Sequence, residues 1–372
     1  MLAVFVAVVA ALLVAHRLGS SPARSDVSTR PPVAAVGSVR THVAAGLAVC
    51  TFVDHSRSTE NFATGVSTPG RRLVTDIYYP TLSSTARAGA RRGASPAYGR
   101  GPYPTVFFGS GYGIDPLDYG PLLESWARSG LVVVAPMFPD ASPAAVASVG
   151  GRGHDTDEAD IPNQPADVVF VTRAVLAESA GAHDGCPVLR GLVDPREIGL
   201  AGQSDGATTV GMLAFDQATA PGTAASYPSL AAGLDYRAVA VLSGEGYGND
   251  PYAASASSPA VLVVQSATDR CNPPQESVDL YDALDEPHRW FLAIRRAHHL
   301  TPYEGQDAAA FAVVAKVTAI FLGAELRGRQ PTAALAAAGN ASPSTATLVE
   351  GPGVPSYMGA QLEQSAAACY QT

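Results

Sequence analysis

The pattern of apolar and polar positions changes once along the chain. Residues 72–79 alternate apolar and polar side chains and residues 47–52 form a similar short run, so both are predicted to be β-strands. From residue 105 onward the strand-like runs are almost entirely apolar, which is typical of strands buried on both faces of a parallel sheet. Segments with helical spacing separate these runs. The predicted buried strands are 105–108, 131–135, 197–201, 238–242, 260–264 and 290–294, and the predicted helices are 117–129, 165–178, 206–215, 275–284 and 308–322.

Strand and helix alternate regularly through residues 105–325. This alternation predicts the α/β class, with a mostly parallel central sheet that is covered by helices on both faces. The two N-terminal strands are expected to form the antiparallel edge of that sheet. One folded domain is therefore predicted over residues 41–325, followed by a tail at residues 326–372 that is rich in Ala, Pro, Gly and Ser.

The chain begins with an unbroken apolar stretch from Leu2 to Ala15, which a run of small residues follows closely. The 14 residues of this stretch are too few to span a bilayer comfortably, but they suit the core of a signal peptide. No positively charged segment precedes the stretch, so a cleaved signal and an uncleaved anchor are both open for residues 1–23. Residues 24–40 are predicted to be a linker. The protein is expected to be secreted or held in the cell envelope.

Four cysteines are spread widely over the sequence, at Cys50, Cys186, Cys271 and Cys369. Their separation excludes a C-x-x-C metal or redox motif. An even number of cysteines in an exported chain favours two disulfides, and three pairings are open. A bridge to Cys369 would tether the C-terminal tail.

Composition narrows the class of function. Of the 372 residues, 47% are hydrophobic and 15% are charged, and the formal net charge is −9. The apolar content excludes global disorder, and the acidic balance argues against a nucleic-acid partner. Beyond the N-terminal stretch no run of 18 apolar residues appears, so a polytopic membrane protein is excluded and no stable membrane partner is expected. The composition assigns no oligomeric state.

The sharpest local motif is the run GQSDG at residues 202–206. It follows a predicted strand and opens a predicted helix, which is the context in which G-x-S-x-G forms a sharp turn that exposes its serine. Glycine suits both ends of the motif because such a turn is strained and brings backbone close to backbone. Ser204 is therefore the candidate nucleophile, and Gln203 is expected in the wall of the site.

A serine hydroxyl needs a base that is itself oriented by an acid. Asp269 follows the predicted strand 260–264 and is the candidate acid. Glu245, which follows the strand before it, is the rival acid and a candidate for the site wall. His298 and His299 follow the last predicted strand, and the spacing Ala-x-His favours His299 as the base, with His298 in the site wall.

Acyl transfer also needs N–H donors that point at the developing oxyanion. The backbone N–H of Asp205, directly after the nucleophile, is one candidate. The second is expected in the Gly-rich run 109–113, where the N–H of Tyr112 is favoured and Gly111 is the alternative. This chemistry requires no metal and no cofactor, and the single histidine among carboxylates at residues 153–160 is interpreted as part of a solvated acidic loop.

Together these residues resemble an α/β-hydrolase serine esterase. Within that superfamily the chain is similar to the bacterial dienelactone-hydrolase-like and platelet-activating-factor-acetylhydrolase-like group, and around the oxyanion loop to cutinase-like polyester hydrolases. The resemblance covers residues 41–325. It rests on residues 71–81, 104–113, 164–167, the turn at Ser204, Asp269 and residues 297–299.

Three departures limit the resemblance. The dienelactone hydrolases proper use a cysteine nucleophile, which Ser204 excludes. The acetylhydrolases carry their acid where Ser243 stands in this chain, which supports Asp269 as the acid. Cutinase-like enzymes usually have His and Met on either side of the serine, where Gln203 and Asp205 stand here, so the resemblance does not imply polyester activity.

The resemblance and the motifs together predict a serine esterase that cleaves carboxylic esters through a Ser-His-Asp triad and an acyl-enzyme. The expected partner is a small-molecule, lipid or polymeric ester. Two alternatives are open. One is an acyltransferase of the cell envelope that uses the same triad, and the other is a non-catalytic binding protein on a hydrolase scaffold.

Overall fold

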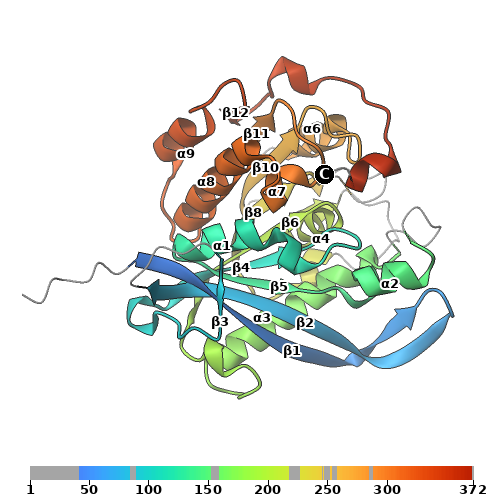
Figure 1. The fold of residues 1–372 in the computed structure, drawn as a ribbon, viewed down its shortest axis with the longest axis vertical. Coiled ribbons are helices and arrows are strands. Elements are labelled where there is room, and N and C mark those ends of the chain that lie inside the picture. The colour runs from blue at the N-terminus through green and yellow to red at the C-terminus, as the bar shows by residue number, and fades with distance from the viewer. Residues whose placement is uncertain are drawn as a thin grey trace, which may run out of the picture. The chain divides into compact units, whose positions relative to one another are not determined.

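A ten-stranded mixed sheet forms the centre of the computed structural model (Figure 1). The strand order is β12-β11-β10-β8-β6-β4-β5-β2-β1-β3. All strand pairs from β5 to β11 are parallel, whereas β1–β2, β2–β5 and β11–β12 are antiparallel. The structure describes residues 42–83, 89–151, 159–217, 227–244, 246, 252–253, 258–284 and 288–370, and the predicted export segment and linker lie outside these ranges.

The strand boundaries extend the apolar runs that the sequence shows. The central strands are β4 (Tyr103–Gly109), β5 (Val132–Pro136), β6 (Val193–Gln203), β8 (Tyr236–Leu242), β10 (Ala260–Ser266) and β11 (Arg289–Ile294). The outer strands are β1 (His42–Asn61), β2 (Val66–Ser83), β3 (Arg91–Arg92) and β12 (Ala346–Glu350). Two short strands, β7 (Asp216–Gln217) and β9 (Tyr252–Ala253), pair separately. The predicted mostly parallel sheet with an antiparallel N-terminal edge is confirmed.

Helices cover both faces of the sheet, as the alternating pattern predicts. The described α-helices are α1 (Gly120–Arg128), α2 (Pro143–Ser148), α3 (Gln164–Ser179), α4 (Asp205–Ala214), α5 (Tyr227–Leu230), α6 (Pro274–Ala283), α7 (Thr301–Glu304), α8 (Ala308–Glu325) and α9 (Thr332–Gly339).

The hydrophobic core has two layers because successive side chains of a strand point to opposite faces of the sheet. Val132 and Val134 of β5 pack in the layer that contains α3, α4 and α6, whereas Val133 between them packs in the layer that contains α1 and α8. Both layers are fully shielded around β5, which explains why its sequence is wholly apolar rather than alternating.

Helix α8 is apolar enough and long enough to cross a membrane by composition alone. Its buried face nevertheless packs in the core layer with α1, and the buried Trp126 indole N–H donates a hydrogen bond of 2.8 Å to Thr318 Oγ1. In this structure α8 therefore contributes to the core of the domain.

The N-terminal strands are longer than the predicted runs. β1 and β2 form an antiparallel hairpin that pairs His42 with Ser83 at one end and Asn61 with Val66 at the other, with a register shift between Asp54 and Ser58. Only the part of the hairpin near the sheet packs against the core. The far part is mostly exposed, so its sequence shows no clear hydrophobic pattern.

The sheet continues past residue 325, where the sequence analysis places the end of the main domain. β12 pairs in antiparallel fashion with β11, and Ala346 and Leu348 turn their side chains into the core. This strand is only five residues long and is surrounded by small residues, so its apolar positions do not stand out from the sequence.

Two disulfides are present, as the even number of cysteines predicts. Cys50 of β1 is bonded to Cys186, which follows α3, and Cys271 of the loop after β10 is bonded to Cys369 near the C-terminus. The second bond tethers the C-terminal segment to that loop. Disulfides of this kind are typical of proteins in oxidising or extracellular compartments.

Candidate active site

The run GQSDG forms a sharp turn between β6 and α4. β6 ends at Gln203, α4 begins at Asp205, and Ser204 between them has φ 55° and ψ −126°. A non-glycine residue with positive φ is strained and persists only where its surroundings hold it. The backbone N–H of Ser204 donates to the Leu242 carbonyl at 3.0 Å, and the Ser204 carbonyl accepts from α4, so the turn is fixed on both sides.

Both glycines of the turn are required by close approaches of the backbone. A Cβ on Gly202 would lie 2.1 Å from the carbonyl oxygen of Gly206, and a Cβ on Gly206 would lie 2.1 Å from that of Gly109. No side chain fits at these distances. The turn therefore crosses directly against the end of β4, and this crossing brings the candidate oxyanion loop (residues 109–113) next to Ser204.

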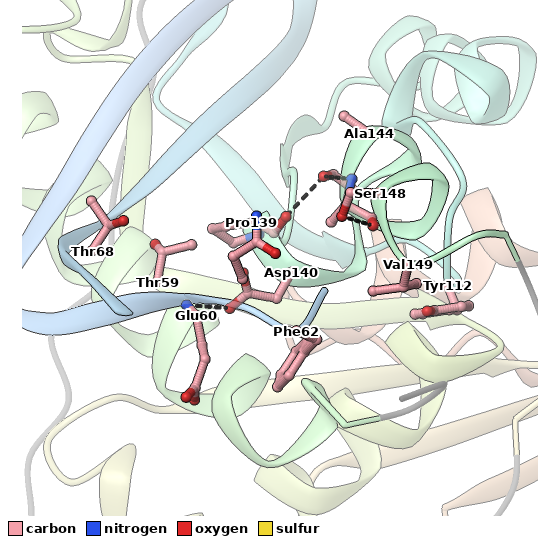
Figure 2. A pocket seen from close by; sticks show the side chains of 13 residues that line it. Thr59, Glu60, Phe62, Thr68, Tyr112, Pro139, Asp140, Ala144, Ser148 and Val149 are labelled. Carbon is pink, nitrogen blue, oxygen red and sulfur yellow. Dashed lines mark hydrogen bonds between the residues drawn. The ribbon is translucent and has the colours of Figure 1, made fainter. Parts of the chain in front are cut away.

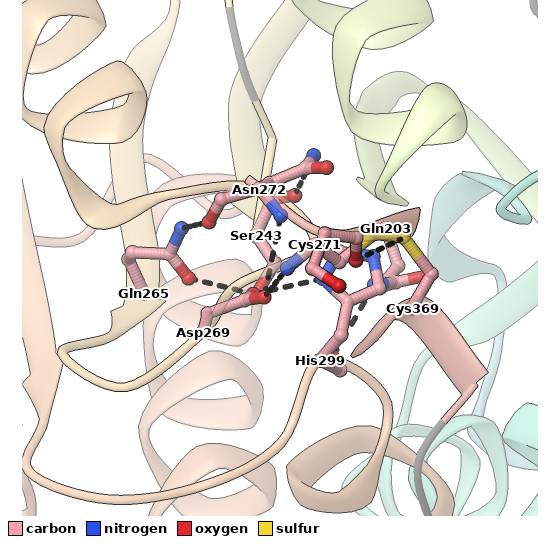
Figure 3. Close-up of a disulfide and its surroundings, with 9 residues drawn as sticks. Gln203, Ser243, Gln265, Asp269, Cys271, Asn272, His299 and Cys369 are labelled. Atoms are coloured by element: carbon pink, nitrogen blue, oxygen red, sulfur yellow. Dashed lines mark hydrogen bonds and ion pairs between the residues drawn. A yellow bond between two sulfur atoms is a disulfide. The ribbon is translucent and has the colours of Figure 1, made fainter. Parts of the chain in front are cut away.

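Asp269 and His299 form a buried hydrogen-bonded pair at the same edge of the sheet (Figure 3). Asp269 Oδ2 lies 2.8 Å from His299 Nδ1, and the two residues are 0% and 3% exposed. Asp269 Oδ1 accepts the backbone N–H groups of Cys271 at 2.9 Å and Asn272 at 3.3 Å. The carboxylate is thus held by backbone donors, and its remaining oxygen faces the imidazole.

Two hydroxyl groups link the loop that carries His299 to the loop that carries Asp269. Ser266 Oγ accepts from the N–H of Ala297 and donates to its carbonyl, each at 2.9 Å. Thr268 Oγ1 lies 3.1 Å from the same two groups. Because these loops follow the neighbouring strands β10 and β11, these hydrogen bonds fix the spacing between Asp269 and His299.

Gln203 lies against His299 and is fully buried. Its side-chain Nε2 is 3.0 Å from His299 Nε2 and 3.5 Å from the His299 carbonyl oxygen. Its Oε1 accepts a hydrogen bond of 2.6 Å from the Tyr119 hydroxyl. Within the described residues the Ser204 hydroxyl has no hydrogen-bond partner, so Gln203 rather than Ser204 contacts Nε2 of the imidazole.

The candidate oxyanion loop passes beside Ser204. A Cβ on Gly111 would lie 3.1 Å from Ser204 Cβ, which shows how closely the backbone of this loop approaches the serine. The N–H of Gly111 donates to the Tyr119 hydroxyl at 3.2 Å, and the N–H of Gly113 donates to the Ala141 carbonyl at 2.8 Å. Gly111, the alternative oxyanion donor, therefore has another partner here. Asp205 directly follows the serine at the start of α4, and Tyr112 lies in the loop that follows β4.

A pocket of about 360 Å³ adjoins the oxyanion loop (Figure 2). Tyr112 forms part of its wall, with Val149 of the α2 end beside it, and the far end of the β1–β2 hairpin supplies Phe62 and Glu60. Its described lining contains no lysine and no arginine, and the exposed Glu60 adds a negative charge.

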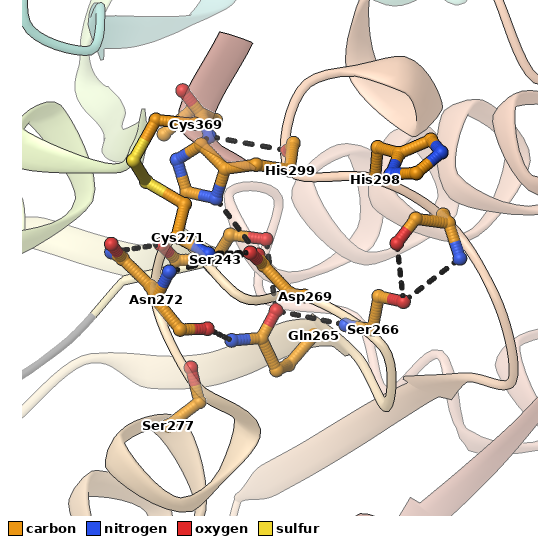
Figure 4. Close-up of polar contacts among 12 residues, drawn as sticks. Ser243, Gln265, Ser266, Asp269, Cys271, Asn272, Ser277, His298, His299 and Cys369 are labelled. Atoms are coloured by element: carbon orange, nitrogen blue, oxygen red, sulfur yellow. Dashed lines mark hydrogen bonds and ion pairs between the residues drawn. A yellow bond between two sulfur atoms is a disulfide. The ribbon is translucent and has the colours of Figure 1, made fainter. Parts of the chain in front are cut away.

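The other histidine of the pair points elsewhere. The side chain of His298 is exposed and is directed away from His299 and Asp269 (Figure 4). It lines a separate recess of about 510 Å³ together with Arg296 and Asp307. The placement of His298 in the wall next to the nucleophile is therefore not what the structure shows.

The rival acid position after β8 is partly outside the described residues. Glu245 is not described, so its place relative to His299 is not part of the structure. Ser243, two residues earlier, has φ 47°, and its Oγ hydrogen-bonds to Gln265 Oε1 at 2.9 Å and to the Tyr303 hydroxyl at 2.8 Å. The end of β8 thus supports the acid loop, whereas Asp269 contacts the imidazole.

Sequence reasoning missed two contributors to this site. Tyr119 lies at the start of the predicted helix 117–129, and nothing in that amphipathic pattern separates it from a core residue. Ser266 stands at the end of a buried strand, where a serine is unremarkable. Among the described residues no group of three or more His, Cys, Asp or Glu side chains is placed to hold a metal ion.

Comparison with solved structures identifies the fold. The chain is similar to a ferulic acid esterase from Streptomyces cinnamoneus, with a TM-score of 0.55 and 20% sequence identity over 77% of this chain and 91% of that chain. No protein-family model and no curated protein sequence matches the chain. At this identity the likeness concerns the fold alone: the chain has the α/β-hydrolase fold.

Proposed function

We propose that this protein is a serine hydrolase that cleaves carboxylic esters, with Ser204 as nucleophile, His299 as base and Asp269 as acid. The observation that carries the proposal is the buried hydrogen bond of 2.8 Å between Asp269 and His299, at the sheet edge where the strained turn holds Ser204. The structural neighbour named as a ferulic acid esterase supports an esterase on this fold. The two disulfides support export of the protein.

In this proposal Ser204 Oγ attacks the ester carbonyl while His299 Nε2 takes its proton. Asp269 orients the imidazole and stabilises the positive charge that it gains. The backbone N–H groups of Tyr112 and Asp205 hold the developing oxyanion. The alcohol leaves with the proton from His299. His299 then takes a proton from a water molecule, which attacks the acyl carbon, and the bond to Ser204 Oγ breaks as that proton returns to the serine and the acid is released.

The pocket beside Tyr112 holds the part of the substrate that lies away from the scissile bond. Its volume of about 360 Å³ is in the range of small-molecule sites, and the residues described in its lining include the exposed Glu60 but no lysine or arginine. Uncharged ester groups suit this pocket better than anionic ones. Replacing Val149 with Trp would fill it and is expected to lower kcat/KM for bulky esters but not for acetate esters.

The nucleophile is tested by Ser204→Ala. The variant should lose hydrolysis of a short p-nitrophenyl ester and labelling by a fluorophosphonate probe, while its thermal unfolding stays close to that of the wild type. Retained hydrolysis would exclude Ser204 as the nucleophile. Absence of labelling in the wild type would favour a non-catalytic binding protein, and product analysis with a competing alcohol separates hydrolysis from acyl transfer.

The base is tested by a matched pair of substitutions. His299→Ala is expected to lower kcat by several orders of magnitude because it removes the proton acceptor, as in other serine hydrolases. His298→Ala is expected to change kcat by less than about threefold, since its side chain points away from Asp269. The reverse ranking would move the base to His298.

A further inference from the structure

Gln203 and Tyr119 connect the oxyanion loop to the imidazole through a chain of hydrogen bonds. We propose that these two residues are positioning residues: they set the tautomer of His299 and occupy its Nε2 in the resting enzyme until Ser204 takes their place. The inference rests on the proposed function and goes beyond it, because it assigns a role to a glutamine and a tyrosine that touch no reacting atom of the substrate.

The direction of the chain follows from its first donor. The backbone N–H of Gly111 can only donate, and it donates to the Tyr119 oxygen at 3.2 Å. The Tyr119 hydroxyl then gives its single hydrogen to Gln203 at 2.6 Å. Gln203 must present its amide oxygen to the tyrosine, so its amide nitrogen faces His299.

The opposite end of the amide gives the same answer independently. The His299 carbonyl oxygen can only accept, and it lies 3.5 Å from Gln203 Nε2. A flipped amide would place its oxygen against that carbonyl, and the Tyr119 hydroxyl would lose the oxygen that accepts its hydrogen. Both ends therefore assign the nitrogen of the Gln203 amide to the histidine.

This orientation determines the protonation of the ring. Because Gln203 Nε2 donates across 3.0 Å, His299 Nε2 must be an acceptor, and the ring proton of the neutral imidazole resides on Nδ1. Nδ1–H then donates to Asp269 Oδ2 at 2.8 Å. A base that takes the serine proton at Nε2 needs this tautomer, and the chain from Gly111 selects it.

The proposed catalytic step changes the partner of Gln203. When the Ser204 Oγ–H bond breaks and an Nε2–H bond forms on His299, the amide of Gln203 loses its acceptor at Nε2 and keeps the His299 carbonyl. The hydrogen bond from Gln203 therefore exists only with the neutral imidazole, and it favours the form that can act as a base.

Among the described residues, the titratable groups around the imidazole lie on the acid loop, at the start of α4 and behind Gln203. Asp269 faces it from the acid loop, and Asp205 follows the nucleophile at the start of α4. Tyr119 stands behind Gln203, and burial raises its pKa well above the usual value, so the phenol stays protonated as the chain requires. Tyr303 lies behind the acid loop against Ser243, and burial likewise raises its pKa.

The experiment compares three variants with a matched control. In Gln203→Glu a carboxylate replaces the amide and stabilises the protonated ring, so the acid limb of the kcat/KM–pH profile is expected to move up by at least about one pH unit. Gln203→Met removes the hydrogen bond and should move the limb in the same direction by less. Tyr119→Phe removes the hydrogen bond to the Gln203 amide oxygen and should move the acid limb by the smallest amount of the three.

The control is Gln164→Met on α3, another fully buried glutamine, whose Oε1 accepts from Thr209 Oγ1. It should alter stability without moving the acid limb. An unmoved limb in folded Gln203→Glu would overturn the proposal. Ring ¹⁵N NMR of the wild type gives a second test: a neutral His299 protonated at Nε2 would also overturn it, even if the variants fail to fold.

The outcomes separate this inference from the proposed function. If the wild type is labelled at Ser204 and the pH limb of Gln203→Glu does not move, the esterase proposal stands and the positioning role fails. If the wild type is not labelled, the esterase proposal fails, and the ring NMR of His299 still decides whether Gly111, Tyr119 and Gln203 set its tautomer.

Discussion

Two buried polar networks in this molecule are built in opposite ways. One is a cluster of charges around the guanidinium of Arg71, where carboxylates meet from several elements. The other is the chain of single hydrogen bonds that runs from Gly111 through Gln203 to His299 and ends at Asp269. The cluster gathers ionisable groups around one guanidinium, whereas in the chain most groups are neutral and each hydrogen bond runs in one direction.

The cluster holds the hairpin to the layer of α3. Arg71 of β2 is 1% exposed and contacts Asp140 at 2.8 Å, Asp160 at 3.0 Å and Asp167 of α3 at 2.6 Å. Arg57 of β1 adds a further contact to Asp167 at 2.6 Å. Burial alone would lower the pKa of Arg71, but the hydrogen bonds and charges of these aspartates raise it above the usual value.

The difference separates the roles that we propose for the two networks. In the cluster each charge is held by partners that cannot change without leaving a buried charge unpaired. In the chain His299 Nε2 has one partner, Gln203, and in our proposal Ser204 takes the place of Gln203 during the catalytic step. We expect substitutions in the chain to change rates and substitutions in the cluster to change stability, and the following predictions test that division.

The largest expected effect is that of Asp269→Asn. Removing the carboxylate should lower kcat by about 10⁴-fold, the loss seen when the acid of a serine-protease triad is replaced by asparagine. Thermal unfolding should change little, because the backbone donors of Cys271 and Asn272 can still bond to the amide oxygen. Ester hydrolysis and a melting curve measure both. A loss of less than tenfold would transfer the role of acid to another carboxylate, with Glu245 as the first candidate.

Arg71→Met is expected to lower the free energy of unfolding by about 3–5 kcal/mol, because it leaves buried carboxylates without their partner. The kcat/KM of the folded fraction should stay within a few fold of the wild type. Urea unfolding measures the loss. Arg57→Met, whose side chain is 24% exposed, is the matched control and should cost much less. Equal losses in the two variants would contradict the central place of Arg71.

The smallest predicted effect is a pH dependence that Asp160 gives to stability. Burial, with repulsion from Asp167 and Asp140, outweighs the attraction of Arg71 and raises the pKa of Asp160 from 3.8 to about 7. The folded state therefore holds this proton more tightly than the unfolded state. The stabilisation is fully present below about pH 4 and is lost as the pH rises through about 7.

Asp160→Asn removes this titration. The melting temperature of the variant, relative to the wild type, should rise between pH 5 and pH 8 and level off above that range. Thermal melts across this range measure it. A melting-temperature difference that is constant with pH would show that Asp160 is ionised throughout this range. A change in kcat/KM would contradict the expectation that the cluster affects stability alone.

Much of the fold could be predicted because its signals are local. The wholly apolar run around Val133 predicts a strand buried on both faces, and the motif around Ser204 predicts a strand, a turn and a helix. Each depends on residues that are near neighbours in sequence. Gly202 also follows from local geometry, since a Cβ there would meet the Gly206 carbonyl within the same turn, whereas Gly206 is required by the distant backbone of Gly109.

The arrangement of the site depends on contacts between distant residues. Gln203 and His299 are 96 positions apart, and Asp269 and His299 are 30 apart. They meet because parallel strands place their carboxyl ends at one edge of the sheet, in a register that the sequence alone does not specify. The pattern could propose His299 over its neighbour, but only the packed loops show which ring faces the acid.

What the sequence alone determined is therefore the class of fold, the position of the sharp turn at Ser204 and a short set of candidate acids and bases. The tertiary structure decided how the cysteines pair, which aspartates gather around Arg71 and which group contacts each nitrogen of His299. The physical reason is the same in each case. Local patterns follow from backbone geometry and the burial of single elements, whereas partners are chosen when separate elements pack and every buried donor must find an acceptor.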